Sequence, residues 1–325
     1  MLHSLTLRSL LRLGSFTPLL VGLAACGDDT AGTGGGGTGG GGTGGGSGGG
    51  ASFTDFQVGG DRPVTVRVPS GFDPSEPTPL FIFLHGYGAT GELNDLLLGF
   101  GPVAKERGLL FAAPDGTRDA NNSQFWNATD ACCNFFGSTV DDVAYIRSLI
   151  DEISQKVSVD PKRIYLAGHS NGAFMSNRFA CDAADRVAAF LSLAGATYAD
   201  PSDCTPSEPV SMIQAHGTND DTILYEGGDL GTAFGRSGFV YPGAEGTVSI
   251  WAELDGCTGT LEAEAGTVDL LADDVGAETT VSRFTGCPSG VDVELWSHAE
   301  AGHIPSPTPA FANAAIDFFL AHPKP

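Results

Sequence analysis

The chain has 325 residues, of which 41% are hydrophobic, and this is enough apolar material to bury a sizeable core. It carries 16 Lys and Arg against 39 Asp and Glu, which gives a formal net charge of −23. A surface this acidic repels polyanions, so we expect neither a nucleic-acid partner nor a polyanionic substrate.

Residues 1–25 have the features of an export signal. Arg8 and Arg12 precede an apolar run over residues 13–25, which contains a proline and is too short to form a stable membrane-spanning helix. The run ends in Leu-Ala-Ala before Cys26, an ending that resembles the bacterial lipoprotein signal, in which the cysteine is lipidated. An ordinary signal peptide cleaved before the cysteine is the alternative. We expect an envelope lipoprotein of the outer membrane or cell surface, or a released protein.

Residues 26–50 are expected to form a tether. From residue 32 to residue 50 the chain contains only Gly, Thr and Ser, a composition that cannot bury apolar surface and behaves as a flexible coil. Residues 51–325 are then long enough for a single catalytic domain. We expect that domain to be a monomer that meets the membrane only through the N-terminal lipid.

The domain alternates apolar strands with amphipathic helices. The unbroken apolar run over residues 80–84 is typical of a central parallel strand. A helix is predicted from Asp141 to about Val157, because acids lie in its first turn and apolar residues share one face. The other predicted elements, in chain order, are two edge strands within 56–68, a strand at 109–113, a long loop at 117–140, a strand at 164–167, a helix at 173–185, strands at 187–193 and 210–214, a helix at 246–254, a strand at 291–298 and a helix at 309–321. This alternation indicates an α/β fold, a mainly parallel central sheet with helices on both faces.

One stretch combines a strand, a serine turn and a helix. The strand over residues 164–167 leads directly into residues 168–172, Gly-His-Ser-Asn-Gly, and a helix follows. This is the setting of a nucleophile elbow, where a tight turn lifts the serine above the edge of the sheet and glycines on both sides avoid a collision. Residues 45–49 match the same pattern, but no strand or helix surrounds them. Ser170 is therefore the candidate nucleophile.

A serine hydroxyl needs a base, and the base needs an acid that orients it. The chain offers these groups in the order serine, acid, histidine, which is the α/β-hydrolase order. The acid is expected in the loop after the strand at 210–214, where Asp220 and Asp221 both qualify. The base is expected in the loop after the last strand, where His303 is better placed than His298, which lies inside that strand.

Two backbone N–H groups are expected to hold the oxyanion that forms during acyl transfer. One belongs to Asn171, directly after the candidate nucleophile. The other lies in the loop after the first central strand, where Tyr87 in the run His-Gly-Tyr-Gly is the best candidate. A plain glycine turn is the alternative for this loop.

A set of short motifs keeps one order across residues 56–321. The motifs are Leu84-His85-Gly86, Trp126-Asn127-Ala128, Cys132-Cys133, Asp141-Asp142-Val143, Gly168 to Ala173, His216-Gly217-Thr218 with Asp220, Tyr225 to Gly228, Trp251-Ala252 with Gly256-Cys257, and Gly302-His303. Together they resemble the polyhydroxybutyrate depolymerase and feruloyl esterase family of secreted α/β-hydrolases, close to carbohydrate esterase family 1. The resemblance implies the α/β-hydrolase fold and ester hydrolysis without a cofactor. It places the nucleophile, acid and base on Ser170, Asp220 and His303.

The chain departs from that family near the site. Asp221 replaces the proline that often follows the acid, and residues 304–306 replace a tryptophan-containing run after the base. Tyr87 stands where relatives often have a small residue or a cysteine, and we expect it to narrow the acyl pocket. Trp126 and His169 are the candidate substrate-binding residues. Trp126 would be a platform for a ring or a sugar, and a tryptophan packed into the domain is the alternative.

Six cysteines remain once Cys26 is set aside, and an even number in an exported chain indicates disulfides. The family resemblance implies a bridge between Cys257 and Cys287. The other four, which allow three pairings, are Cys132, Cys133, Cys181 and Cys204. We expect no bridge between the two adjacent cysteines, because so small a ring is strained. No C-x-x-C spacing occurs and each histidine is accounted for otherwise, so no metal site is expected.

These observations predict a lipid-anchored serine esterase that acts through an acyl-enzyme on feruloyl or acetyl esters of plant polysaccharide, or on hydroxyalkanoate esters. A polyhydroxybutyrate depolymerase that acts on solid polyester is the first alternative. We expect soluble esters to be cleaved better, because a short tether holds the site near a membrane, where a granule meets it poorly. A serine peptidase or acyltransferase is a second alternative, and a non-catalytic envelope protein that binds carbohydrate or polyester is a third.

Overall fold

The computed structural model describes residues 53–234, 237–272 and 276–325. The predicted signal peptide, the lipidation site Cys26 and the glycine-rich tether lie outside these residues and stay predictions. Within the three described ranges, no helix combines the length and the apolar character that a membrane crossing would need.

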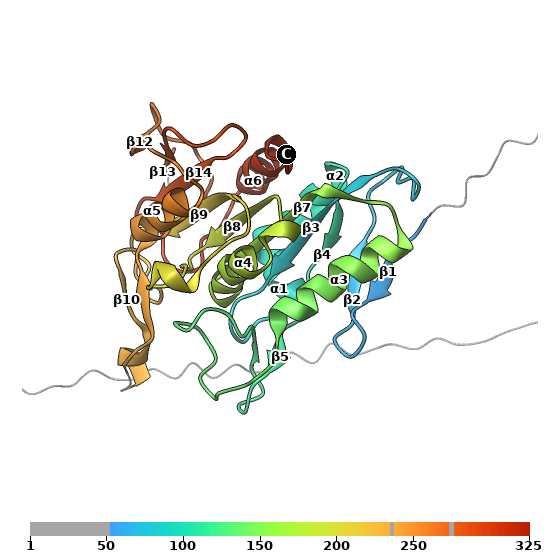
Figure 1. Cartoon of the computed structure of the whole chain (residues 1–325), viewed down its shortest axis with the longest axis horizontal. Coiled ribbons are helices and arrows are strands. Elements are labelled where there is room, and N and C mark those ends of the chain that lie inside the picture. The colour runs from blue at the N-terminus through green and yellow to red at the C-terminus, as the bar shows by residue number, and fades with distance from the viewer. Residues whose placement is uncertain (1–52, 235–236, 273–275) are drawn as a thin grey trace, which may run out of the picture. The chain divides into compact units, whose positions relative to one another are not determined.

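A ten-stranded mixed sheet organises the domain (Figure 1). Its central strands are parallel and follow the order β4 (Leu110–Ala112), β3 (Thr78–Leu84), β7 (Val159–His169), β8 (Ala189–Leu193), β9 (Ser211–Gly217) and β14 (Val293–His298). Antiparallel strands extend both edges, namely β1 (Phe56–Val58) and β2 (Val64–Arg67) beyond β4, and β13 (Thr279–Phe284) and β12 (Leu261–Ala263) beyond β14. This sheet confirms the predicted mainly parallel arrangement.

Each face of the sheet has its own apolar core, because successive side chains of a strand point to opposite faces. In β3, Leu80, Ile82 and Leu84 pack into one core, whereas Phe81 and Phe83 pack into the other. The helices that cover the first face are α3 (Asp142–Lys156), α4 (Asn171–Asp182) and α5 (Ala244–Leu254). The helices that cover the second face are α2 (Phe100–Glu106) and α6 (Pro309–Ala321). Helices on both faces confirm the expected layering.

Several elements differ from the predictions. Helix α1 (Gly91–Leu98) and helix α2 were not predicted, and neither were β12 and β13. The long loop predicted at 117–140 contains a two-stranded hairpin, β5 (Thr117–Arg118) with β6 (Gln124–Phe125). A second small sheet pairs β10 (Gly227–Asp229) with β11 (Val240–Pro242). Short 3-10 turns lie at Ala184–Arg186, Pro201–Asp203 and Leu230–Phe234.

Side-chain caps fix the start of several helices. Asp141 accepts a hydrogen bond from the backbone N–H of Ala144 at 2.9 Å, so α3 begins where the acidic pair predicted it. Thr90 caps α1 in the same way, because its hydroxyl oxygen accepts a hydrogen bond from the backbone N–H of Leu93 at 3.2 Å. The cap on α1 matters for the site, because this helix follows directly on the predicted oxyanion loop.

The described cysteines form three disulfides. The structure pairs Cys257 with Cys287 and Cys181 with Cys204. It also pairs Cys132 with Cys133, so the expectation of no bridge between these neighbours is wrong. The peptide bond between them is cis and places their Cα atoms 3.1 Å apart, so the small ring closes despite the strain that the expectation rested on.

Candidate active site

Ser170 lies at a sharp turn between β7 and α4. Its backbone angles are φ 55° and ψ −120°, a conformation that L-residues rarely adopt and that is typical of a nucleophile elbow. A Cβ on Gly168 would lie 2.0 Å from the carbonyl oxygen of Gly172. A Cβ on Gly172 would lie 2.1 Å from the carbonyl oxygen of Leu84. Both glycines are therefore needed for the turn, for the steric reason that the sequence indicated.

Three loops bring the candidate catalytic side chains together. Ser170, Asp220 and His303 follow β7, β9 and β14, whose carboxyl ends share one edge of the sheet. The Nε2 atom of His303 lies 2.9 Å from the Ser170 Oγ, and its Nδ1 lies 2.8 Å from the Asp220 Oδ2. This is the hydrogen-bond chain that a Ser–His–Asp triad requires.

Asp221 and His298, the alternative candidates for the acid and the base, are not part of this hydrogen-bond chain. Asp221 is exposed, and its carboxylate accepts a hydrogen bond from the Thr222 hydroxyl at 3.2 Å. His298 is fully buried inside β14, and its Nδ1 lies 2.7 Å from the hydroxyl of Thr279 on the neighbouring strand. Neither side chain makes a hydrogen bond to Ser170 or His303 in the described part of the chain.

Asp220 is held as a carboxylate. Its Oδ1 accepts the backbone N–H groups of Thr222 and Ile223, both at 2.9 Å. Burial would raise the pKa of Asp220, but hydrogen bonds from His216 and His303, the charge of His303 and the Thr222 N–H together lower the pKa below its ordinary value. The carboxyl group therefore stays ionised at neutral pH and can orient the imidazole of His303.

His216 is a second imidazole on the same carboxylate. Its Nε2 lies 3.2 Å from the Asp220 Oδ2 and 2.8 Å from the carbonyl oxygen of Ile223. Its Nδ1 lies 3.2 Å from the Nε2 of Gln214, whose amide group also donates to the carbonyl oxygen of Gly195 at 2.9 Å. The Gln214 donor places the proton of His216 on Nε2, toward Asp220. The sequence indicates this histidine only as part of a motif, because most of the residues that contact it are not its neighbours in the sequence.

His169 packs beside the elbow. Its Nε2 donates to the backbone carbonyl of His303 at 3.0 Å, and the two rings lie 5.2 Å apart. Burial, with the nearby His303, lowers the pKa of His169 to about 4, so its ring is neutral near pH 7. The ring borders the cleft at Ser170, while its hydrogen bond holds the backbone of the candidate base. A contact to substrate stays a prediction.

The predicted oxyanion loop lies against the elbow. A Cβ on Gly86 would be 3.3 Å from the Cβ of Ser170. Among the described residues, neither the backbone N–H of Tyr87 nor that of Asn171 has a hydrogen-bond acceptor. Two unpaired donors beside a nucleophile fit the requirement of an oxyanion hole. The Tyr87 side chain is separate from this hole: its hydroxyl donates to the carboxylate of Asp119, and the residue lines the cleft beside Ser170.

Trp126 is not a platform for a substrate ring. Its side chain is fully buried, and its indole N–H donates to the backbone carbonyl of His85 at 3.1 Å. The ring lies between the oxyanion loop and α3, where it stacks on Tyr145 with centroids 6.4 Å apart. The alternative of a tryptophan packed into the domain is therefore the one that the structure shows.

An apolar cleft of about 220 Å³ opens beside Ser170. Its lining includes Leu93 and Leu97 of α1 and Ile304, the residue after the candidate base. These side chains are 62%, 48% and 61% exposed, which is unusual for large apolar residues at neighbouring positions. The cleft fits the apolar part of a small ligand whose reacting group lies at Ser170.

The parallel sheet, the strained serine turn and the Ser–His–Asp hydrogen-bond chain at the carboxyl edge define a protein of the α/β-hydrolase class. The chain belongs to the phospholipase/carboxylesterase family, whose sequence profile matches residues 72–234.

The chain is also similar to feruloyl esterases, as its motifs indicated. It is 31% identical to feruloyl esterase B of Piromyces equi over 245 residues, which are 74% of this chain and 42% of that protein. It is 27% identical to feruloyl esterase C of Emericella nidulans over 237 residues, which are 70% of this chain and 73% of that protein. The chain thus spans less than half of the length of feruloyl esterase B.

A solved structure with a similar fold is the acetyl xylan esterase from Aspergillus awamori. The TM-score is 0.55, and the match covers 83% of this chain and 100% of that chain. The sequence identity is 15%, so this likeness concerns the fold alone.

Proposed function

We propose that this protein is a serine esterase that hydrolyses carboxylic esters through an acyl-enzyme. The observation that carries the proposal is the continuous hydrogen-bond chain from the Ser170 Oγ through His303 to Asp220, at 2.9 and 2.8 Å. These hydrogen bonds end at the carboxylate of Asp220, whose lowered pKa keeps it charged. A binding protein of the same fold would not need this arrangement, which costs a strained backbone at Ser170.

Each group has a defined part in the reaction. His303 takes the proton of Ser170 as the Oγ attacks the ester carbonyl, and Asp220 stabilises the imidazolium that forms. The N–H groups of Tyr87 and Asn171 bind the oxyanion. His303 then gives its proton to the leaving alcohol, and water repeats the sequence to release the acid from the acyl-enzyme. No step needs a cofactor.

The cleft favours esters with an apolar acyl group of modest size. Leu93, Leu97 and Ile304 present only carbon to a ligand, so they suit a short alkyl chain or a hydroxycinnamoyl ring better than a charged group. The similarity to feruloyl esterases supports the same substrate class. We propose feruloyl or acetyl esters on carbohydrate, with hydroxyalkanoate esters as related substrates.

We further propose that the protein works outside the cytoplasm, tethered through Cys26. The disulfides of the described domain support an oxidising compartment, because such bonds are rare in the cytosol. The apolar run before Cys26 and the glycine-rich residues 32–50 supply an anchor signal and a spacer.

A depolymerase that acts on solid polyester is a second candidate. The observation that favours it is Leu96 of α1, which is 79% exposed next to the two leucines of the cleft. Exposed leucines on one helix could rest on an apolar polymer surface.

A substrate comparison separates the two candidates. The domain lacking residues 1–50 is expected to turn over methyl ferulate and p-nitrophenyl acetate and to clear a polyhydroxybutyrate suspension slowly. The measurement is kcat/KM on each soluble ester beside the loss of turbidity of the suspension. Rapid clearing with little turnover of the soluble esters would favour the depolymerase, and no turnover of any ester would refute the esterase proposal.

A substitution in the cleft tests whether these side chains bind the acyl group. Leu97→Ser is expected to raise KM for methyl ferulate by about tenfold, because replacing a contacting leucine typically costs about 1–3 kcal/mol of binding. Val268→Ser is the control, because Val268 is similarly exposed, at 44% against 48% for Leu97, and is not part of the cleft. Equal effects of the two substitutions would contradict recognition of the acyl group by this cleft.

A further inference from the structure

Trp126 makes three hydrogen bonds to two segments of the proposed oxyanion site. Its backbone N–H donates to the side-chain oxygen of Asn171 at 2.7 Å, and the Asn171 amide group donates back to the Trp126 carbonyl at 3.0 Å. Its indole N–H donates to the carbonyl oxygen of His85 at 3.1 Å. One buried residue therefore contacts both the start of the oxyanion loop and the first residue of the nucleophile helix.

The two proposed oxyanion donors belong to separate parts of the fold. The N–H of Tyr87 is carried by the loop after β3, and the N–H of Asn171 is carried by the start of α4. An oxyanion hole works only when both donors are held at the right separation before the reaction begins, and a supporting contact to both segments would fix that separation. Trp126 is bonded to the oxyanion loop at His85, two residues before the Tyr87 donor, and to α4 at Asn171, which is the second donor residue.

We propose that Trp126 is a positioning residue that sets the distance between the two N–H donors of the oxyanion hole. The inference rests on the proposed esterase function. Trp126 touches no substrate, because its side chain is fully buried, and it acts through His85 and Asn171.

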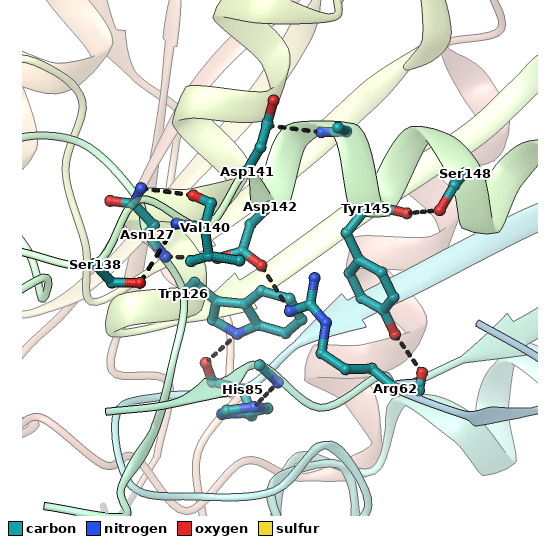
Figure 2. A network of polar contacts seen from close by, with 12 residues as sticks. Arg62, His85, Trp126, Asn127, Ser138, Val140, Asp141, Asp142, Tyr145 and Ser148 are labelled. Atoms are coloured by element: carbon teal, nitrogen blue, oxygen red, sulfur yellow. Dashed lines mark hydrogen bonds and ion pairs between the residues drawn. The ribbon is translucent and has the colours of Figure 1, made fainter. Parts of the chain in front are cut away.

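A polar network around the fully buried carboxylate of Asp142 holds Trp126 itself in place (Figure 2). The carboxylate of Asp142 accepts the backbone N–H of Asn127 at 2.7 Å and the guanidinium of Arg62, also at 2.7 Å. The guanidinium carbon of Arg62 lies 3.5 Å from the ring centroid of Tyr145, and the same tyrosine stacks on the Trp126 indole. Asp142 and Tyr145 belong to α3, so the tryptophan is fixed to a rigid element of the fold and not to a free loop.

The chain offers a matched control for a purely structural tryptophan. Trp251 is also fully buried, and its indole N–H donates to the side-chain oxygen of Asn177 at 2.8 Å. Changing either tryptophan to phenylalanine removes one buried indole N–H and leaves an aromatic ring in the core. Trp126 donates its indole N–H to the oxyanion loop, at His85, whereas the partner of Trp251 lies further along α4, at Asn177. Of the two substitutions, only Trp126→Phe should therefore affect the binding of the oxyanion.

The test compares Trp126→Phe and Trp251→Phe in the full chain. The readouts are kcat and KM on p-nitrophenyl acetate and the inhibition constant of phenylboronic acid, which forms a tetrahedral adduct with an active serine. Trp126→Phe is expected to lower kcat by about 10- to 100-fold, less than the loss of a donor itself, with KM changed by less than about twofold. The inhibition constant is expected to rise by a similar factor, and Trp251→Phe is expected to change neither value more than about twofold.

Equal losses of kcat in the two variants, or a loss of kcat in Trp126→Phe without a weaker inhibitor, would overturn the inference and leave the esterase proposal standing. Wild-type protein without ester hydrolysis would refute both. If Trp126→Phe does not fold, Asn171→Ala replaces it, because this variant keeps the backbone N–H and removes both side-chain bonds to Trp126. The same fall in kcat and rise in the inhibition constant are expected, and unchanged values would overturn the inference.

Discussion

Ser170→Ala is expected to abolish ester hydrolysis and to leave the fold intact. The substitution removes the oxygen that would attack the ester, while an alanine occupies nearly the same volume at the turn. Loss of a catalytic serine in a triad typically lowers kcat by a factor of about 10⁴ to 10⁶. The measurement is kcat on p-nitrophenyl acetate, with the spontaneous hydrolysis in buffer subtracted and the melting temperature recorded beside it.

Ser176→Ala is the control for this variant. Ser176 is buried in α4, the helix that follows Ser170, and its hydroxyl donates to the carbonyl oxygen of Gly172 at 3.0 Å. Removing this hydroxyl disturbs the region without removing the proposed nucleophile. We expect it to keep most of the activity. If Ser170→Ala retains more than about a tenth of the wild-type rate, then Ser170 is not the nucleophile.

Asp220→Asn is expected to lower kcat by a factor of about 10⁴. The substitution replaces one acceptor oxygen of the carboxylate by an NH₂ donor and keeps the shape of the side chain. The Oδ1 position must still accept the N–H groups of Thr222 and Ile223, so the new amide NH₂ would face the N–H groups of His216 and His303. Donors would then oppose donors, and the imidazole of His303 would lose the orientation in which its Nε2 accepts the serine proton.

Asp221→Asn provides the neighbouring comparison. Asp221 is exposed, and its side chain bonds to the Thr222 hydroxyl, so we expect kcat to stay within about twofold of wild type. The two variants are compared by kcat on the same soluble ester. A larger loss in Asp221→Asn than in Asp220→Asn would move the acid by one residue and contradict the geometry.

The fold could be predicted where burial leaves a simple pattern in the sequence. The central strand β3 is buried on both faces and therefore appears as an unbroken apolar run. Helix α1 could not be predicted in this way, because Leu93, Leu96 and Leu97 face outward and the buried residues include Asn94 and Asp95. The buried carboxylate of Asp95 has polar partners: it accepts hydrogen bonds from the guanidinium of Arg67, at 2.7 Å, and from the backbone N–H of Gly101. The three leucines recur at helical spacing, but an amphipathic reading of that spacing would have buried the wrong face of α1.

The candidate site could be predicted to the level of its motifs and no further. Ser170 and His303 follow strands in recognisable runs, so their positions at one edge of the sheet could be inferred from the chain order. The contacts of Trp126 and His216 depend on side chains that are distant in sequence, and nothing in the local pattern shows which partners will pack against them. The pairing of Cys132 with Cys133 depends on a backbone conformation that composition and spacing do not reveal.

Labelling with a fluorophosphonate probe tests the central claim most directly, because only a serine that is activated by a base reacts with it. We expect stoichiometric labelling of the native protein on the tryptic peptide of residues 164–178, which contains Ser170 and ends at Arg178. The label should be absent from Ser170→Ala and from heat-denatured protein. No labelling of the native protein, or a label that persists in Ser170→Ala, would contradict the assignment of Ser170 as an activated nucleophile.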